Sequence, residues 1–244
     1  PFMFEELFSL FDEKLSDHLE FVPVSPWYRF HFPDGSDFDY GEDMAAFEAG
    51  MARYREADIE GYRRLLEASR EIFEVGFEKL ADQPFLKFTD MLKQVPALLK
   101  LRSDLTVSQF VKKYITHPYL QQALSIHPLL VGGNPYDTTS IYALIHYLER
   151  KWGVHFCMGG TGKLVSELEK LMRRHGVGIH TGADVEEIVV SDKKVTGIKC
   201  VDGRQMDADL VVCNADPPTV YREMMPVGGK SFLRPKKIIP EALT

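Results

Sequence analysis

The stretch that decides the fold is Trp152–Asp216, WGVHFCMGGTGKLVSELEKLMRRHGVGIHTGADVEEIVVSDKKVTGIKCVDGRQMDADLVVCNAD. Its residue pattern predicts a glycine turn, an amphipathic helix, a short strand, a two-stranded ribbon and a final buried strand. This order is typical of the second half of a nucleotide-binding domain. We therefore expect a mixed α/β protein whose N-terminal residues form a different, helix-rich part.

The pattern inside this stretch predicts each element. Apolar residues spaced three and four apart predict a helix from Lys163 to His175, and Gly176 stands where a C-terminal cap belongs. Alternation predicts paired strands around 185–190 and 195–201, with a hairpin-type turn at Asp202-Gly203. The continuous apolar run within 209–214 predicts a strand covered on both faces.

The glycines at 159, 160 and 162 fail two phosphate-binding motifs. A P-loop would need Gly at Cys157 and Ser or Thr at Leu164, and the third glycine of GxGxxG would fall on Val165. The glycines are therefore expected to let the chain enter the following helix rather than to hold phosphates.

Residues 1–150 carry mostly helical patterns. Helices are predicted over Phe2–Leu15 and Asp58–Leu80, and a capping box at Thr106–Gln109 predicts the start of another. Three short strands are expected around 19–40, the last two joined by a turn at 33–35. The glycines of Val131–Pro135 permit close approach of a flat ligand to the main chain, or they form a plain turn between helices.

Composition excludes several classes of function. The net charge of −7 argues against a nucleic-acid binder. The three cysteines lack CxxC spacing, which favours a reducing cytoplasm and argues against a metal site. Residues 83–115 are locally basic and apolar, as in a segment that lies in a membrane interface with its lysines toward anionic headgroups. The alternative is an ordinary helical hairpin broken at Pro96.

Several motifs together resemble one family. They are FLKFTDML, SIHPLLVGGNPYDTTSIYALIHYLERKWGV, MGGTGKLV and ADLVVCNADP. They are similar to the FAD-dependent carotenoid (phytoene) desaturases of bacteria and fungi, within the flavin amine-oxidase superfamily. The family's opening GxGxxG segment and its closing glycine-rich segment are not in this sequence. The chain is therefore expected to be an internal fragment that retains little FAD and is inactive alone.

The resemblance implies an architecture. We expect a substrate-binding and membrane-associating domain over 1–152, with a small antiparallel sheet. Residues 153–222 would be the returning part of an FAD-binding Rossmann-like domain, and residues 223–244 a linker or the start of the next substrate-domain segment. The implied location is cytoplasmic and peripherally membrane-associated, and the sequence does not indicate an oligomeric state.

The resemblance also implies a reaction. The protein would desaturate a long hydrophobic polyene such as phytoene, with a hydride passing to FAD and a proton to a base or to water. Asp90 in FLKFTDML is the candidate base, although Thr89 stands where some relatives would have Arg, and His127 ranks second. The alternative interpretations are a solvated helix carboxylate for Asp90 and a core histidine for His127.

Cofactor contacts follow from the same resemblance. The Val185 main chain is expected to contact adenine, and Gly159 and Gly160 to contact FAD. Gly132, Gly133 and Asn134 would line the flavin or substrate side. Two other functions stay open: a different flavoenzyme of the superfamily, such as a polyene isomerase, a saturase or an amine oxidase-like enzyme, or a non-catalytic module that binds a membrane or a partner.

Overall fold

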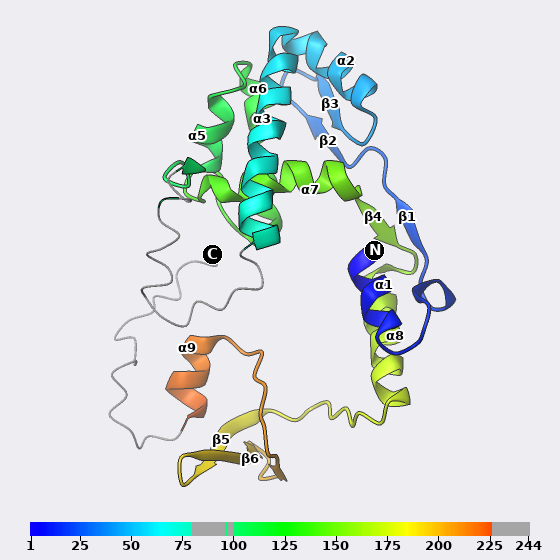
Figure 1. The fold of residues 1–244 in the computed structure, drawn as a ribbon, viewed down its shortest axis with the longest axis vertical. Helices are drawn as coiled ribbons and strands as arrows, with labels where there is room; N and C mark the ends of the chain where they lie inside the picture. The colour runs from blue at the N-terminus through cyan, green and yellow to red at the C-terminus, as the bar shows by residue number, and fades with distance from the viewer. Residues whose placement is uncertain (80–95, 97–99, 226–244) are drawn as a thin grey trace. The chain divides into compact units, whose positions relative to one another are not determined.

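The computed structural model describes residues 1–79, 96 and 100–225 (Figure 1). The chain forms two compact units, Pro1–Leu168 and Glu169–Thr244, and the division falls inside helix α8 (Gly160–Arg174). Helices and small antiparallel sheets occur together, so the predicted mixed α/β class is confirmed. The domain boundaries at 152 and 222 stay predictions.

The first unit is mainly helical. Its helical elements, including short 3-10 and π segments, are α1 (Phe2–Ser9), η1 (Leu15–Asp17), α2 (Met44–Arg55), α3 (Ala57–Phe73), η2 (Glu74–Lys79), α5 (Val107–Lys112), α6 (Pro118–Ala123), η3 (His127–Val131), η4 (Ser140–Ala143) and α7 (Leu144–Trp152). Its strands form two antiparallel pairs, β1 (Phe21–Pro23) with β4 (His155–Cys157) and β2 (Tyr28–His31) with β3 (Asp37–Tyr40).

The core of the first unit lies where α3 packs against α2 and α7 (Figure 1). Large aromatic side chains from the β3 strand and these helices fill it, among them Phe38, Tyr40, Phe47 and Tyr62. Burial of such side chains is the main favourable contribution to folding. The core therefore joins the hairpin firmly to the helices.

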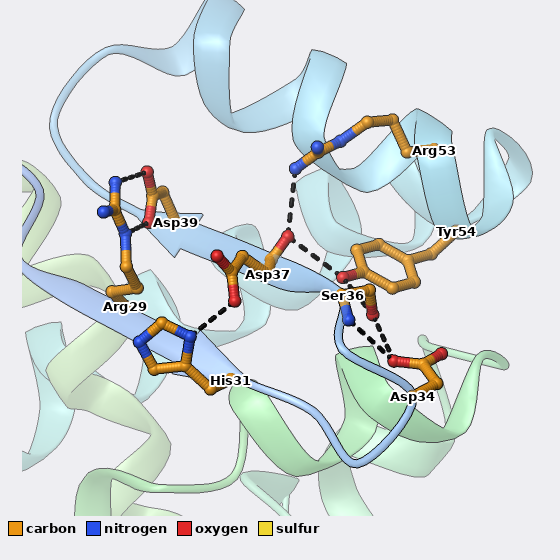
Figure 2. Close-up of polar contacts among 8 residues, drawn as sticks. All are labelled: Arg29, His31, Asp34, Ser36, Asp37, Asp39, Arg53 and Tyr54. Atoms are coloured by element: carbon orange, nitrogen blue, oxygen red, sulfur yellow. Dashed lines mark hydrogen bonds and ion pairs between the residues drawn. The ribbon is translucent and has the colours of Figure 1, made fainter.

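The hairpin of β2 and β3 has one charged face and one aromatic face. On the charged face the Arg29 guanidinium pairs with Asp39 and the His31 ring with Asp37, each across the two strands (Figure 2). The Tyr54 hydroxyl of α2 donates to the main-chain oxygen of Asp37. Tyr28 lies on the opposite face, because side chains alternate along a strand.

Two local predictions for the first unit are confirmed and one needs correction. The capping box of Thr106 and Gln109 is present at the start of α5, and 33–35 is a turn between β2 and β3. The helix predicted over Phe2–Leu15 ends at Ser9, because Asp12 is left-handed (φ 58°) and Glu13 N–H donates to Phe8 O, which closes the helix end.

Helix α2 was missed by the sequence analysis. Its apolar pattern is weak, and it buries only Phe47 and Met51. The signal that was present is Asp43, whose carboxylate accepts from the main-chain N–H groups of Ala45 and Ala46. The helix predicted over Asp58–Leu80 is α3, followed by the π segment η2.

The second unit contains a three-stranded antiparallel sheet. The order is β5 (Val185–Ser191), β6 (Lys194–Cys200) and β7 (Gln205–Asp207), followed by α9 (Pro217–Thr219) and η5 (Val220–Met224). The predicted pairing and the turn at Asp202-Gly203 are confirmed, and β7 adds a third strand. Gly176 caps α8 as predicted, with φ 78°.

The short strand predicted between the helix and the two-stranded ribbon and the strand predicted over 209–214 are wrong, because neither segment is a strand. Leu210 and Val212 are 78% and 87% exposed, whereas the prediction placed them between two layers. A strand needs a neighbouring strand to take its main-chain hydrogen bonds. Within the described residues, nothing pairs with this run.

Candidate functional site

Glu149 of α7 joins three separate segments in the core of the first unit. Its side chain is only 5% exposed. The Tyr28 hydroxyl from β2 lies 2.5 Å from Oε1, and His127 Nε2 from η3 lies 3.0 Å from Oε2. Each carboxylate oxygen therefore has its own partner, as a buried charge requires. We call these three residues the Glu149 clasp.

Hydrogen-bond chemistry places the protons of the clasp. A carboxylate oxygen accepts from a hydroxyl, so Tyr28 donates toward Oε1, and His127 Nε2 is the hydrogen-bond partner of Oε2. Burial raises the pKa of Tyr28, and the hydrogen bond to Glu149 raises it further. His127 is fully buried, and its Nδ1 has no hydrogen-bond partner in the structure.

A second hydrogen-bonded chain runs beside the clasp. Arg150 Nε donates to the Tyr62 hydroxyl at 3.0 Å, and the Tyr62 and Tyr40 hydroxyls are 3.3 Å apart. The Tyr40 hydroxyl lies 3.2 Å from His146 Nδ1, and His146 Nε2 lies 2.9 Å from Leu124 O. Since Leu124 O can only accept, His146 carries its proton on Nε2 and accepts from Tyr40.

His146 is kept neutral by its surroundings. Full burial lowers its pKa well below the usual value, and the neighbouring His127 lowers it further. The two imidazole rings meet edge to face, with centroids 4.1 Å apart. The core thus holds a neutral histidine beside one that is paired with a carboxylate.

Arg150 anchors the start of α2 to α7. Its Nη1 donates to the main-chain oxygens of Gly41 and Glu42. The guanidinium carbon lies 4.7–5.7 Å from the ring centroids of Trp27, Tyr40, Phe47 and Tyr62. Such cation–π contacts are worth about 0.5–2 kcal/mol each. Arg150 is thus a structural tie rather than a free cation.

The predicted glycine loop forms a tight turn directly after η3. Gly132 is left-handed (φ 74°), and a Cβ on Gly133 would lie 2.6 Å from Thr138 Oγ1. Asn134 Oδ1 accepts from Tyr136 N–H at 2.9 Å. These glycines therefore have a structural reason to be there, and a role beside a flavin or substrate stays a prediction.

Gly159 and Gly160 lie at the start of α8. Both are left-handed, with φ 87° and 78°, and a Cβ on Gly160 or Gly162 would meet nothing within 4 Å. The space beside Gly160 and Gly162 is therefore open, whereas the Lys163 side chain lies close to Gly159. Lys163, the lysine of the P-loop-like run, pairs instead with Glu167 at 2.6 Å. This pairing agrees with the rejection of a P-loop.

Val185 lies at the start of β5, an edge strand of the sheet. Asp184 O accepts from Val201 N–H, and Cys200 N–H donates away from β5 to Arg204 O. The Val185–Cys200 pair is therefore of the non-hydrogen-bonded kind, and the main-chain N–H and C=O of Val185 point to the outer edge. A main-chain donor and acceptor that point away from the neighbouring strand fit the hydrogen-bonding edge of an adenine ring.

The predicted site residues that the structure describes belong to both units. His127 lies in the clasp and the loop 132–134 follows it, while Val185 belongs to the second unit. Asp90 lies outside the described residues. A catalytic role for Asp90 or His127 stays a prediction.

Glu149, Tyr28 and His146 were not among the predicted site residues. One signal was available: Ala143, His146 and Glu149 recur every third residue, and all three are buried. Polar residues on the buried face of a helix indicate a hydrogen-bonded network. Their partners could not be identified, since Tyr28 is 121 residues from Glu149.

A separate cavity of about 370 Å³ lies beside β3 and α2. Its lining includes Asp39, Glu42, Asp43 and Arg53. Asp39 is already paired with Arg29, and Arg53 donates to a main-chain oxygen (Figure 2). Apolar residues such as Ala46 and Phe47 complete the lining, so charged and apolar groups are mixed in this cavity.

Comparison with known proteins gives one consistent result. Residues 4–238 match the model of the flavin containing amine oxidoreductase family. The chain is 44% identical over 233 residues to the lycopene-forming phytoene desaturase of Pseudescherichia vulneris, which covers 94% of this chain and 47% of that protein.

More distant relatives agree. Identity is 35% to the neurosporene-forming phytoene desaturase of Rhodobacter capsulatus, over 92% of this chain and 43% of that protein. It is 29% to the 4,4'-diaponeurosporene oxygenase of Staphylococcus aureus, over 93% of this chain and 46% of that protein. The chain therefore spans just under half the length of these relatives. It belongs to the flavin-containing amine oxidoreductase family.

Proposed function

We propose that the full-length protein carrying this sequence is an FAD-dependent desaturase of a long isoprenoid polyene such as phytoene. The observation that carries this proposal is the similarity to phytoene desaturases along 94% of the chain. In this proposal residues 1–152 form the substrate-binding part, and residues 153–222 are the returning part of the FAD-binding domain.

The residues at the two predicted cofactor sites fit FAD. The Val185 main chain would hold the adenine end, and the open helix start at Gly159 and Gly160 would contact another part of the cofactor. FAD, when bound, supplies an acceptor for hydride. The residues of this chain have to bind the polyene, exclude water and take up a proton.

Asp90 is our proposed base. Loss of hydride from an allylic carbon leaves a cation that is a strong acid, so an ordinary carboxylate can accept its proton. His127 ranks below Asp90, because its Nε2 is bonded to Glu149 and its ring is fully buried. An Asp90→Asn variant of the full-length enzyme is expected to lose at least about tenfold in kcat with unchanged flavin content. Unchanged kcat would remove Asp90 from this role.

We also propose that the protein is cytoplasmic and docks on the membrane through residues 83–115. None of the helices in the described residues is long and apolar enough to cross a bilayer. The bases Lys87, Lys93 and Lys100 of this segment suit anionic headgroups. Charge reversal of all three should abolish flotation of the full-length protein with anionic liposomes. Unchanged flotation would rule out this docking segment.

One relative supports a second candidate function. The Staphylococcus aureus protein is named as an oxygenase of a polyene, so related sequences carry different oxidations. Chromatography and mass measurement of the products of the full-length enzyme distinguish the two. Desaturation lengthens the conjugated chromophore with loss of two hydrogens per step, whereas oxygenation adds oxygen. A polyene returned with no added double bond would overturn our proposal.

A further inference from the structure

We propose that Glu149 is a positioning residue, which fixes the loop 127–134 through His127 and Tyr28 so that the loop meets the substrate in one orientation. The inference rests on the proposed function for its substrate, a long apolar polyene. Its structural part, the fixing of the loop by Glu149, rests only on contacts within the first unit.

The Glu149 clasp ties elements that are distant in sequence. Glu149 on α7 holds Tyr28 of β2 through one oxygen and His127, the first residue of η3, through the other. The β2 strand is in turn held by its pairing with β3. His127, at the start of η3, is thereby fixed to both the β2–β3 hairpin and helix α7.

Hydrogen bonds within the loop hold its shape beyond His127. Gly133 N–H donates to Pro128 O at 2.8 Å, and Thr138 N–H donates to Asn134 O at 2.8 Å. The Gly133 position has no room for a side chain. A displacement of His127 would therefore move the loop as a body instead of being absorbed within it.

This loop carries apolar side chains at its surface. Leu129, Leu130 and Val131 are each more than half exposed, although they follow the fully buried His127 directly. Residues 128–133 contain no charged side chain. Such a surface is uncharged, like a hydrocarbon, and it sits next to the glycines for which the sequence predicts a flavin-side or substrate-side position.

The Glu149 clasp places polar side chains in the core, where apolar side chains could have packed, and this choice needs an explanation. Replacing a buried ionised network by apolar residues of similar volume is often neutral or stabilising, so stability alone does not account for a carboxylate here. Two hydrogen bonds of fixed direction define the position of η3 more narrowly than apolar packing does. A positional role accounts for Glu149, Tyr28 and His127 together.

The test compares variants of the full-length flavoenzyme. Glu149→Leu fills the same space without accepting hydrogen bonds and should lower kcat/KM for the polyene by about 10- to 100-fold, since small misplacements have effects of this size. Glu149→Gln can keep both contacts, because Tyr28 and His127 can each donate or accept, and should stay within about fivefold of wild type. Tyr28→Phe should fall between them.

Asp58→Asn is the matched control. Asp58 is an equally buried carboxylate of the same unit, and it holds the main-chain N–H groups of Thr116 and His117. It should lower thermal stability without lowering kcat/KM. Glu149→Leu and Tyr28→Phe both within twofold of wild type would overturn the proposal. Losses of kcat/KM in Glu149→Leu and Tyr28→Phe that only equal the loss in Asp58→Asn would also overturn it. So would a Glu149→Gln variant with a kcat/KM as low as that of Glu149→Leu.

Hydrogen exchange separates this proposal from the proposed function. Amides of residues 129–134 should exchange faster in Glu149→Leu and Tyr28→Phe than in wild type, and should be unchanged in Asp58→Asn. If wild type proves colourless or inactive, the proposed function fails while the exchange result still decides the structural part. Unchanged exchange in both clasp variants would overturn that part.

Discussion

The two units bury their apolar residues very differently. The first unit packs Phe38, Tyr40 and Tyr62 around a hydrogen-bonded polar network, with none of these rings exposed. In the described part of the second unit, the buried apolar side chains are Leu171, Ile188 and Cys200. The difference teaches that local strand pairing can form with few buried apolar side chains. The Glu149 clasp needs an extensive core, because a buried carboxylate depends on partners that the surrounding packing holds in place.

The largest expected effect tests how tightly the first unit is packed. A Cβ at Gly61 of α3 would overlap the main-chain oxygen of Tyr114, so Gly61→Ala should lower the free energy of unfolding by about 3 kcal/mol. This loss is expected although alanine is more favourable than glycine in a helix by about 1 kcal/mol. Fluorescence of the 244-residue chain in urea measures it, since Trp27 and Trp152 both lie in the first unit.

Gly50→Ala in α2 is the control for this substitution. Its Cβ would lie 3.5 Å from the Phe38 ring, an ordinary contact. It should be neutral or stabilising by up to about 1 kcal/mol. Equal destabilisation by the two alanines would show that the packing at Gly61 is not tight.

The next prediction compares equivalent truncations in the two units. Leu65→Ala, at a fully buried site, should reduce the free energy of unfolding by about 3 kcal/mol. Ile188→Ala should reduce it by about 2 kcal/mol, because the thinner surroundings can collapse around the missing atoms. Hydrogen exchange of α3 and of β5 reports the two local changes. A larger loss at Ile188 would contradict the comparison.

A smaller effect concerns pH. Because the pKa of His146 is lowered in the folded state, the unfolded chain binds a proton that the native chain does not. Stability from this residue is present above the unfolded pKa of about 6.5 and is lost as pH falls below it, by at most about 1.4 kcal/mol per pH unit. Urea unfolding measures the free energy of unfolding at pH 7.5 and at pH 5.5. The difference between the two values should be smaller for His146→Gln than for wild type. Identical pH dependence would contradict the assignment.

The smallest effect is expected at Val212. Its side chain is 87% exposed, so Val212→Ser should change the free energy of unfolding of the 244-residue chain by less than about 0.5 kcal/mol. A loss near 2 kcal/mol, typical of a buried valine, would instead favour the covered strand that the sequence predicted.

What could be predicted from the sequence depended on local chemistry. The caps at Thr106 and Gly176 involve neighbouring residues, so their patterns identified them correctly. The end of α1 at Ser9 was missed, because a left-handed aspartate at 12 is uncommon. The run 209–214 has the composition of a buried strand, but its state depends on partners that composition does not reveal.

The candidate site shows the same limit. The mixed α/β class followed from the periodicity, whereas the family motifs made His127 and the glycine loop candidate site residues, whose roles stay predictions. Glu149 and Tyr28 were not found, because their meeting depends on how the hairpin packs against α7 and on no motif within either segment. Long-range polar contacts of this kind become visible only in three dimensions.

One measurement tests the central claim most directly. The full-length protein is purified, its visible flavin absorbance is recorded without oxygen, and the polyene is added in liposomes. We predict that the oxidised-flavin band bleaches in step with the appearance of a longer conjugated chromophore and returns when an electron acceptor is added. Conversion of the polyene while the flavin band stays unchanged, or a colourless protein, would contradict the account.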